Sequence, residues 1–567
     1  MSIGLFTALP LLAQLVLPDE DAIFADRFYP TTMSSGEAAA FLQRATFGVR
    51  MEDIDQLQSQ GYSAWLDEQL ALEMTDVTSV MLLIEEARFA FCQNNPMDEE
   101  CESEDGEVPL HPADREAAWW EAAMLAPDQL RQRVAFALSQ ILVVSDRHDE
   151  LADHALALAF YYDLLLEHAL GNYRELLEEV SLSPVMGLYL SHARNRAAVP
   201  ELNIRPDENF AREIMQLFSI GLIELNSDGS PVLDSQGQTI ATYGQAEVKD
   251  MARIFTGWTY AGGCAEFASD DFEIELLEPM ESCPTYHDSG SKQLINGVQV
   301  PAGQTPLADV QVALDALVNH PNAGPFIGRR LIQSLVTSNP SPAYIGRVAA
   351  AFADNGQGER GDLAAVVRAI LLDSEALAGV SGDPAFGKLR EPILRRSAIW
   401  RSFNAQSTSG RFYPWDVLYA GGQRPLGAPS VFNFFLPDYA SDGLIDQGLR
   451  GPEFQLASDD LLTLNANLML NESFTLAGAP WLDDPELEGE LDENTALMRV
   501  DIEMALLNQP DPLIDRLDLL LTAGNLSSSL RQELSDRLNA SVDEPPHLRV
   551  AELIALITAS SDFLIQR

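Results

Sequence analysis

The sequence predicts a mainly α fold, a large compact multi-helical unit with long loops and a minor β-hairpin. Apolar residues recur at the i, i+3, i+4, i+7 spacing of helices in most segments, whereas alternating strand patterns are scarce. The chain has 567 residues, of which 46% are hydrophobic and 21% charged. This composition is typical of a globular protein with a large core.

Helix start and stop signals divide the N-terminal third. Ser34 and Glu37 form the pattern of a capping box before a helix predicted over residues 38–45. Gly61 follows a second predicted helix over residues 52–60, in the position that favours a left-handed backbone. Further helices are predicted over residues 64–72, 114–124, 127–144, 151–170, 173–180 and 184–195.

Two short capped helices are predicted within residues 206–221 and 242–257. Thr242 and Gln245 fit a capping box for the second helix. Val248 and Met251 then begin an apolar stripe at helical spacing, and Gly257 ends the helix. The later predicted helices cover residues 308–319, 325–337, 342–354, 363–373, 390–403, 457–470, 494–507, 512–521, 528–538 and 548–560.

Strand signals are confined to two places. Residues 225–240 read as a hairpin rich in turns, with turns at 226–229 and 234–237. Residues 272–277 and 298–300 form a second candidate pair. Because no repeat of fixed period is evident, we expect residues 31–567 to form a single helical domain rather than a solenoid.

The charge balance is strongly acidic. There are 35 Lys and Arg residues against 86 Asp and Glu, a formal net charge of −51. Such a surface repels phosphate backbones and anionic lipid, so the composition argues against nucleic-acid binding and against unaided membrane docking. The simplest interpretation is a salt-adapted surface, since net charge governs solubility rather than fold.

The N-terminus and the cysteines bear on location. Residues 3–17 are an apolar run, too short to cross a bilayer but long enough for the core of a signal peptide, although no Lys or Arg precedes it. Residues 1–30 are therefore a signal-like segment or a packed helix. The cysteines suggest two local disulfides, Cys92–Cys101 and Cys264–Cys283, which would require an oxidising compartment. The alternative is four unrelated thiols in a cytosolic protein. We expect an extracytoplasmic, periplasmic or secreted protein without a transmembrane segment.

Several motifs together resemble one bacterial family. They are FLQRATFG at 41–48, GYSAWLDEQL at 61–70, LRQRVAFALSQ at 130–140, DENFARE at 207–213, ARIFTGW at 252–258 and APSVFNF at 428–434. The family is catalogued as domain of unknown function 1800. The resemblance implies a helical, often secreted protein, often encoded beside an alkaline-phosphatase-like protein. The resemblance does not indicate which reaction, if any, the protein performs, and it leaves the cofactor open.

The candidate catalytic residues are Glu208, Glu213, His287 and Asp288. Two carboxylates could act as acid and base in glycan hydrolysis, and histidine titrates near neutrality. Alternatively, His287 with its acidic neighbours could hold calcium or zinc. Asn209, Arg212, Arg253, Trp258 and Lys292 are the candidate binding residues around them.

The same residues also fit a structural interpretation, in which Glu213, Arg212, Arg253 and Trp258 belong to a buried network. Gly356, Gly358 and Gly361 match a dinucleotide-binding spacing, but a predicted helix precedes them instead of a strand. The leading hypothesis is an extracytoplasmic hydrolase-like or binding protein for a polymer such as a glycan. The alternative is a non-catalytic scaffold or chaperone for the phosphatase-like neighbour. An open cleft lined by the four candidates would favour an enzyme, whereas mutual salt bridges would favour the scaffold.

Overall fold

The structure, a computed structural model, describes residues 33–94, 110–269, 272, 274–378, 385–413, 422–482 and 492–567. The signal-like segment 1–30 and Cys101 lie outside these residues.

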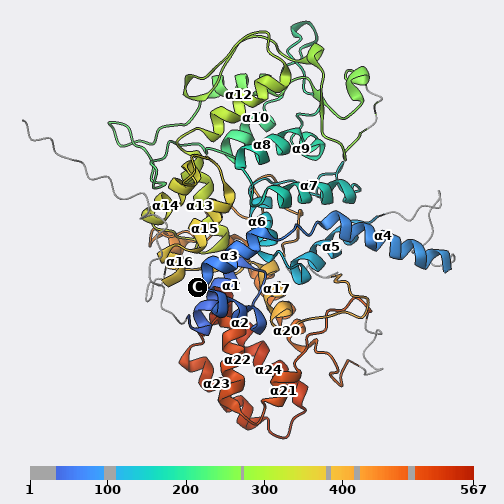
Figure 1. Cartoon of the computed structure of the whole chain (residues 1–567), viewed down its shortest axis with the longest axis vertical. Helices are drawn as coiled ribbons and strands as arrows, with labels where there is room; N and C mark the ends of the chain where they lie inside the picture. The colour runs from blue at the N-terminus through green and yellow to red at the C-terminus, as the bar shows by residue number, and fades with distance from the viewer. Residues whose placement is uncertain are drawn as a thin grey trace, which may run out of the picture.

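The predicted mainly α class is confirmed (Figure 1). The helices are α1 Ser35–Ala45, α2 Met51–Gln60, α3 Tyr62–Ala71, α4 Val77–Asn94, α5 Pro112–Leu125, α6 Gln129–Ser139, α7 Ala155–His168, α8 Tyr173–Leu182, α9 Pro184–Tyr189, α10 Asn209–Gln216, α11 Gln245–Ile254, α12 Pro306–Val318, α13 Ala323–Leu335, α14 Pro342–Ala353, α15 Leu363–Leu371, α16 Ser374–Ala378, α17 Pro392–Ser402, α19 Asp442–Ile445, α20 Asp459–Phe474, α21 Asp501–Ala505, α22 Pro510–Thr522, α23 Ser528–Ala540, α24 Pro546–Thr558 and α25 Ser561–Leu564. In Figure 1, α8–α12 lie at one end of the long axis and α21–α24 at the other.

The strands are short and form three antiparallel pairs within the described residues. β1 (Trp258–Thr259) pairs with β2 (Glu281–Ser282), β3 (Lys292–Gln293) with β4 (Gln299–Val300), and β5 (Lys388–Leu389) with β6 (Ile565–Gln566). The predicted pairing of 298–300 with 272–277 is wrong, because a tight turn lets the nearer segment, β3, satisfy the backbone of β4. The turn-rich hairpin has the expected bridges, Leu225 to Pro231 and Leu233 to Thr239.

The helix caps show where local sequence is decisive. The capping box at Ser34 and Glu37 is present, with Glu37 N donating to Ser34 Oγ over 3.2 Å. The box predicted at Thr242 and Gln245 is wrong. Thr242 Oγ1 donates instead to the carbonyl oxygen of Gly221, and Glu247 accepts from Gly244 N over 2.8 Å. The nearer carboxylate thus caps α11.

Buried apolar side chains between Ala38 and Phe563 form one hydrophobic cluster. Phe563 belongs to this cluster, and the strand β6 that follows it pairs with β5 at residues 388–389. In the part of the chain that the structure describes, no helix has both the length and the apolar character required to cross a membrane.

Candidate functional site

His287 and Lys292 converge on one carboxylate, Asp309 of α12. His287 Nε2 lies 3.0 Å from Asp309 Oδ2, and Lys292 Nζ donates to the same oxygen over 2.5 Å. Gln304 Nε2 donates to Asp309 Oδ1 over 2.9 Å. We call His287, Lys292, Gln304 and Asp309 the Asp309 network. Burial alone would raise the pKa of Asp309, but the hydrogen bonds it accepts outweigh burial and lower that pKa.

His287, Lys292 and Asp309 are buried, whereas Gln304 is partly exposed at the edge of the Asp309 network. The side chains of Lys292 and Asp309 are 0% and 1% exposed. His287 Nδ1 lies 2.8 Å from the carbonyl oxygen of Thr256, so both ring nitrogens have a polar partner within the protein. Lys292 also donates to the carbonyl oxygens of Asp288 and Gly290. These groups are therefore satisfied by the protein itself.

A close backbone approach places His287. Gly257 has a φ of +79°, and a Cβ at this position would lie 2.8 Å from His287 N. Only glycine allows this contact, which explains the Gly257 that precedes Trp258. The Cys264–Cys283 disulfide, with Cα atoms 5.6 Å apart, braces the same segment. Its sulfurs are consumed by the disulfide, so the adjacent Glu281 gains no thiolate partners for a metal.

Asp288 is held by arginine. Arg253 Nε and Nη2 donate to its two carboxylate oxygens over 2.8 and 2.9 Å, and Arg253 Nη1 donates to Asp250 over 2.7 Å. The bond from Arg253 lowers the pKa of Asp288, and the bond to Asp288 raises that of Arg253. Trp258 is buried beside this segment. A carboxylate in a bidentate arginine pair is a poor general base.

Glu208 and Glu213 lie at α10. Glu208 accepts from Gln245 Nε2 over 2.7 Å and pairs with Arg212 over 3.3 Å, while Asn209 is exposed. Glu213 is 5% exposed, and its Oε2 has no hydrogen-bond partner among the described residues. Burial raises the pKa of Glu213, and the charge of Arg212 opposes the shift.

The four candidate catalytic side chains fall into two groups. In the described residues, no hydrogen bond or ion pair joins Glu208 or Glu213 to His287 or Asp288. The helix α11 connects them, because α10 packs on one part of it and β3 and α12 on another. The expected disulfide Cys264–Cys283 is present, and Cys92 is buried near the end of α4.

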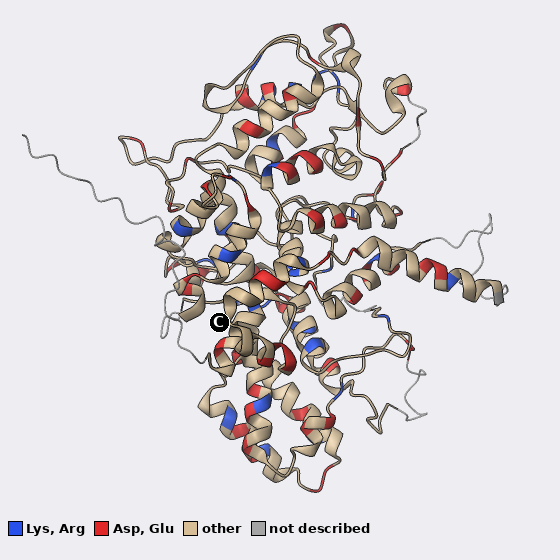
Figure 2. Ribbon diagram, in the orientation of Figure 1, with Lys and Arg blue, Asp and Glu red and all other residues tan. Residues whose placement is uncertain are grey.

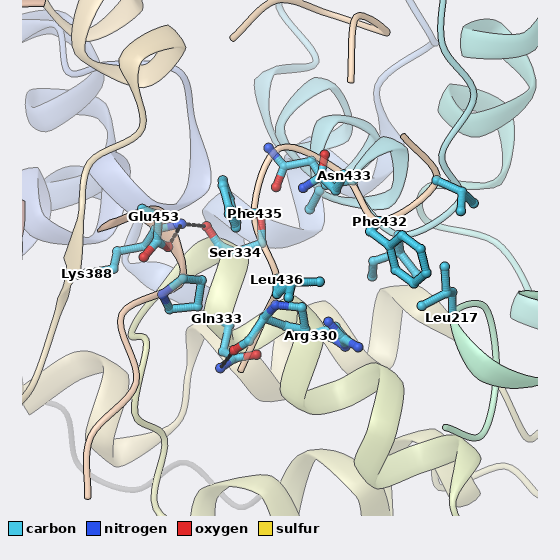
Figure 3. Close-up of a pocket in the computed structure, with 16 residues that line it drawn as sticks. Leu217, Arg330, Gln333, Ser334, Lys388, Phe432, Asn433, Phe435, Leu436 and Glu453 are labelled. Carbon is cyan, nitrogen blue, oxygen red and sulfur yellow. Dashed lines mark hydrogen bonds and ion pairs between the residues drawn. The ribbon is translucent and has the colours of Figure 1, made fainter. Parts of the chain in front are cut away.

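A separate cavity of about 70 Å³ lies where α6 and α13 meet residues 431–437 (Figure 3). We call it the Arg330 cavity. Leu217, Phe432 and Leu436 contribute apolar walls, and Arg330, Lys388 and Glu453 contribute charge. In Figure 3, Arg330 lies on the side of Phe432 and Leu217, and Lys388 and Glu453 lie on the opposite side.

Arg330 differs from every other charge in this cavity. Lys388 is 0% exposed at its side chain and lies 3.1 Å from Glu391 and 3.0 Å from Glu453. No oxygen of the described residues accepts a hydrogen bond from Arg330. Its neighbour Arg329, in contrast, pairs with Asp438 over 2.9 Å. Arg330 is only partly exposed, and burial lowers its pKa to about 10 although the charge of Asp438 opposes the shift. The cation is therefore partly desolvated and has no hydrogen-bonded anion among the described residues.

Arg330 is positioned by its own helix. The Phe326 ring, one turn earlier on α13, lies 4.9 Å from the Arg330 guanidinium carbon and stabilises its charge. The facing segment is also held firmly. Gln333 Nε2 donates to the carbonyl oxygen of Pro437 over 3.2 Å, and Leu436 N donates to Gln455 over 2.8 Å. The cavity is thus a formed site that presents one cation.

Residues 40–565 match the family described as "Protein of unknown function (DUF1800)". The chain belongs to this family. No curated protein and no solved structure matches it. The family motif at 428–434 lies in the loop whose Val431, Phe432 and Asn433 line the Arg330 cavity.

Asp309 and Arg330 were not predicted as site residues from the sequence. Asp309 sits 22 residues after His287, in the first turn of α12, where a carboxylate suits a helix N-terminus without indicating a network. Arg330 follows Arg329 directly, and no local pattern says which of the two lacks a partner. The motif at 428–434 was the one sequence signal for this cavity, because its Val431, Phe432 and Asn433 line the cavity together with Arg330 of α13.

Proposed function

We propose that this DUF1800 protein is an extracytoplasmic, non-catalytic binding protein. Its Arg330 cavity would take an anionic group of a polymer, such as the carboxylate of an acidic glycan. The observation that supports this best is the partly buried guanidinium of Arg330, which lines a formed cavity and has no hydrogen-bond partner among the described residues. The disulfide Cys264–Cys283 supports an oxidising location.

The size of the cavity limits what can enter. A volume of about 70 Å³ is enough for one carboxylate or phosphate group, because roughly 10–15 Å³ of cavity volume is enough for one water. The rest of the ligand would lie outside, against Phe432, which is 44% exposed. An aromatic face is a good surface for a sugar ring. One buried group with an exposed continuation is the geometry expected for a polymer.

Binding is favoured over catalysis by the state of the candidate catalytic residues. Asp288 is paired with Arg253, and His287 is paired with Asp309 behind a closed surface. A reacting substrate needs an unpaired acid or base within reach. Glu213 Oε2 has no partner among the described residues, but the residue is only 5% exposed and so is out of reach of a substrate in solvent. The net charge of −51 does not prevent anion binding, since screening at physiological ionic strength limits repulsion to roughly 8 Å.

A calorimetric titration with a trimer of galacturonic acid tests the proposal. Wild type should bind the trimer and release it intact, and should not bind its uncharged methyl ester. Arg330→Met should weaken binding by roughly 10- to 150-fold, the worth of a charge-assisted hydrogen bond. Arg329→Met is the matched control, because its partner Asp438 is half of a surface pair.

The binding proposal fails if Arg330→Met binds the trimer as tightly as wild type. It also fails if the methyl ester binds equally well, or if neither the trimer nor inorganic phosphate binds. Cleavage of the trimer by wild type would favour the hydrolase hypothesis instead.

A second candidate function, a scaffold for an alkaline-phosphatase-like protein, has one observation in its favour. The helix α4 projects from the body in Figure 1. Its Leu82, Leu83 and Phe89 are 43%, 59% and 47% exposed. Exposed apolar residues grouped on one element are typical of protein interfaces. Leu83→Glu should then abolish co-purification with the phosphatase-like neighbour, whereas Leu462→Glu on α20 should not.

A further inference from the structure

A larger cavity, of about 930 Å³, lies against α7, α8 and the start of α4. Six carboxylate residues line it, namely Asp76, Asp163, Glu167, Glu175, Glu178 and Glu179. Among the described lining residues there is no Lys or Arg. Figure 2 shows the Asp and Glu residues on α7 and α8. The cavity is therefore an acidic hollow that differs in charge from the Arg330 cavity.

Most acidic clusters on such a protein are plain solvated surface, but this one contains a buried imidazole. His168 ends α7 and is 8% exposed. Its Nε2 lies 3.0 Å from Glu179 Oε2, but the two groups lack the geometry of a hydrogen bond, and Nε2 has no hydrogen-bond partner among the described residues. Leaving a buried ring nitrogen unsatisfied costs about 1–3 kcal/mol, so a missing partner is indicated.

The ligand atoms are close enough to share one ion. One ligand atom each of Glu167, His168 and Glu179 lies within 4.8 Å of the other two. Atoms about 2.1 Å from a common ion are about 3.0 Å apart at right angles and at most about 4.2 Å apart. The 3.0 Å separation of His168 and Glu179 already fits. Glu167 and Glu179 are exposed, so their carboxylates can rotate to bring the remaining ligand-atom distances below about 4.2 Å.

We propose that Glu167, His168 and Glu179 bind one divalent transition-metal ion of the Zn²⁺ or Mn²⁺ type. One imidazole nitrogen with two carboxylate oxygens is a donor set for such ions, whereas Ca²⁺ and Mg²⁺ prefer oxygen alone. Three protein ligands leave coordination positions open toward the 930 Å³ cavity. The site is therefore able to present the ion to a second ligand.

The surroundings favour a cation. His168 is in the last turn of a 14-residue helix, where the helix dipole is negative. No Lys or Arg of the described residues pairs with Glu167 or Glu175, and the ring of His168 is the only group paired with Glu179. Arg131 donates to the main-chain carbonyl oxygens of Leu166 and Glu167 and not to the carboxylate of Glu167. Glu178 is already paired with Arg174 over 2.6 Å, which excludes it from the ligand set.

Equilibrium dialysis of the full chain against Zn²⁺ tests the site, with millimolar Mg²⁺ present to occupy weak carboxylate sites. Wild type should retain one Zn²⁺ per chain. His168→Gln and Glu179→Gln should each lower the affinity by at least about 100-fold, since even outer-shell changes cost 10- to 100-fold. His154→Gln is the matched control, because His154 is exposed at the other end of α7. Circular dichroism verifies that each variant is folded.

Cobalt substitution provides the second readout. Co²⁺ bound to nitrogen and oxygen ligands should show visible absorption in wild type and in His154→Gln, but not in His168→Gln. The proposal is overturned if wild type retains no stoichiometric Zn²⁺. It is equally overturned if His168→Gln and Glu179→Gln bind Zn²⁺ as wild type does, because the His168–Glu179 contact is then only an ion pair. Neither result bears on the Arg330 cavity.

Discussion

The Asp309 network and the Arg330 cavity use the same kinds of side chain and treat them in opposite ways. In the network, Lys292 and His287 are both matched to Asp309 within a closed interior. In the cavity, Lys388 is matched to Glu391 and Glu453. Arg330 has no hydrogen bond or ion pair among the described residues, although the charge of Asp438 acts on it. A buried charge that is paired within the protein has a structural role. An unpaired charge that lines a cavity is instead a candidate for binding a ligand.

The difference teaches that charge alone does not mark a functional site. Glu208, His287 and Asp288 stand out in the sequence because their side chains are of types that can act as an acid or a base. Each has its partner in the protein, so the observation that separates function from structure is pairing. Pairing is a tertiary property, so it is tested by substitutions that remove one partner of a pair.

Asp309→Ala should be the most destabilising change. It leaves Lys292 buried with only carbonyl acceptors, and breaking a buried pair costs about 3–5 kcal/mol of unfolding free energy. Urea denaturation monitored by hydrogen exchange at α11 and α12 measures the loss. Asp315→Ala on the same helix is the control, since its pair with Arg174 is exposed and worth about 1 kcal/mol or less.

Equal stability of Asp309→Ala and Asp315→Ala would contradict the structural role of the Asp309 network. That result would show that the Asp309 pairs are not needed for stability. His287 and Lys292 would then again be candidates for catalysis.

Acid should destabilise the packing beneath α10 through His192. Its Nε2 lies 2.9 Å from the carbonyl oxygen of Ser181 and its ring stacks on Phe210, with centroids 3.8 Å apart. Burial lowers the pKa of His192 to about 4, against about 6.5 in the unfolded chain. The folded state therefore resists protonation, and stability is lost as pH falls from about 6.5 to 4. At pH 4.5 the loss is about 2–3 kcal/mol.

His192→Gln isolates this effect, because glutamine can still donate to Ser181 but does not titrate. Urea midpoints at pH 7 and pH 4.5 should differ less for His192→Gln than for wild type. Equal pH dependence in the two proteins would show that carboxylates elsewhere account for the acid sensitivity.

Glu213→Gln should have the smallest effect, a gain of up to about 1 kcal/mol at pH 8. Burial raises the pKa of Glu213, so its contribution to stability is present at low pH and lost as pH rises through the folded pKa. A neutral amide removes that loss, and the gain should vanish near pH 4.5. The control is Glu208→Gln, which changes a carboxylate that already has partners. A large loss of stability at pH 8 would instead show that the Glu213 charge is needed.

Local signals predicted much of the fold. The capping box at Ser34 is the N-cap of α1, although the predicted start at residue 38 is three residues late, and the apolar stripe from Val248 identifies α11. The helix α4 was missed, although Asp76 accepts from Ser79 N over 2.6 Å as a cap, because its sequence is apolar on several faces. The helix predicted over 494–507 shrinks to α21, since Leu497 and Met498 make extended backbone contacts instead.

The sites were harder to predict because they depend on long-range partners. The sequence places His287, Asp288 and Lys292 together, but Asp309 and Arg253 reach them from other elements. Likewise, nothing near Arg330 in the sequence reveals that Asp438 pairs with its neighbour Arg329 instead. His168 looks like a packed helical histidine until α8 brings Glu179 beside it.

One diffraction experiment tests the central claim that unmatched charge, and not charge itself, marks the binding site. Crystals soaked in selenate would report bound anion by its anomalous signal. The account predicts a peak within hydrogen-bond distance of Arg330, about 3 Å from its guanidinium, and none at Lys292 or His287. A peak at Lys292 or His287 with the Arg330 cavity empty would contradict it.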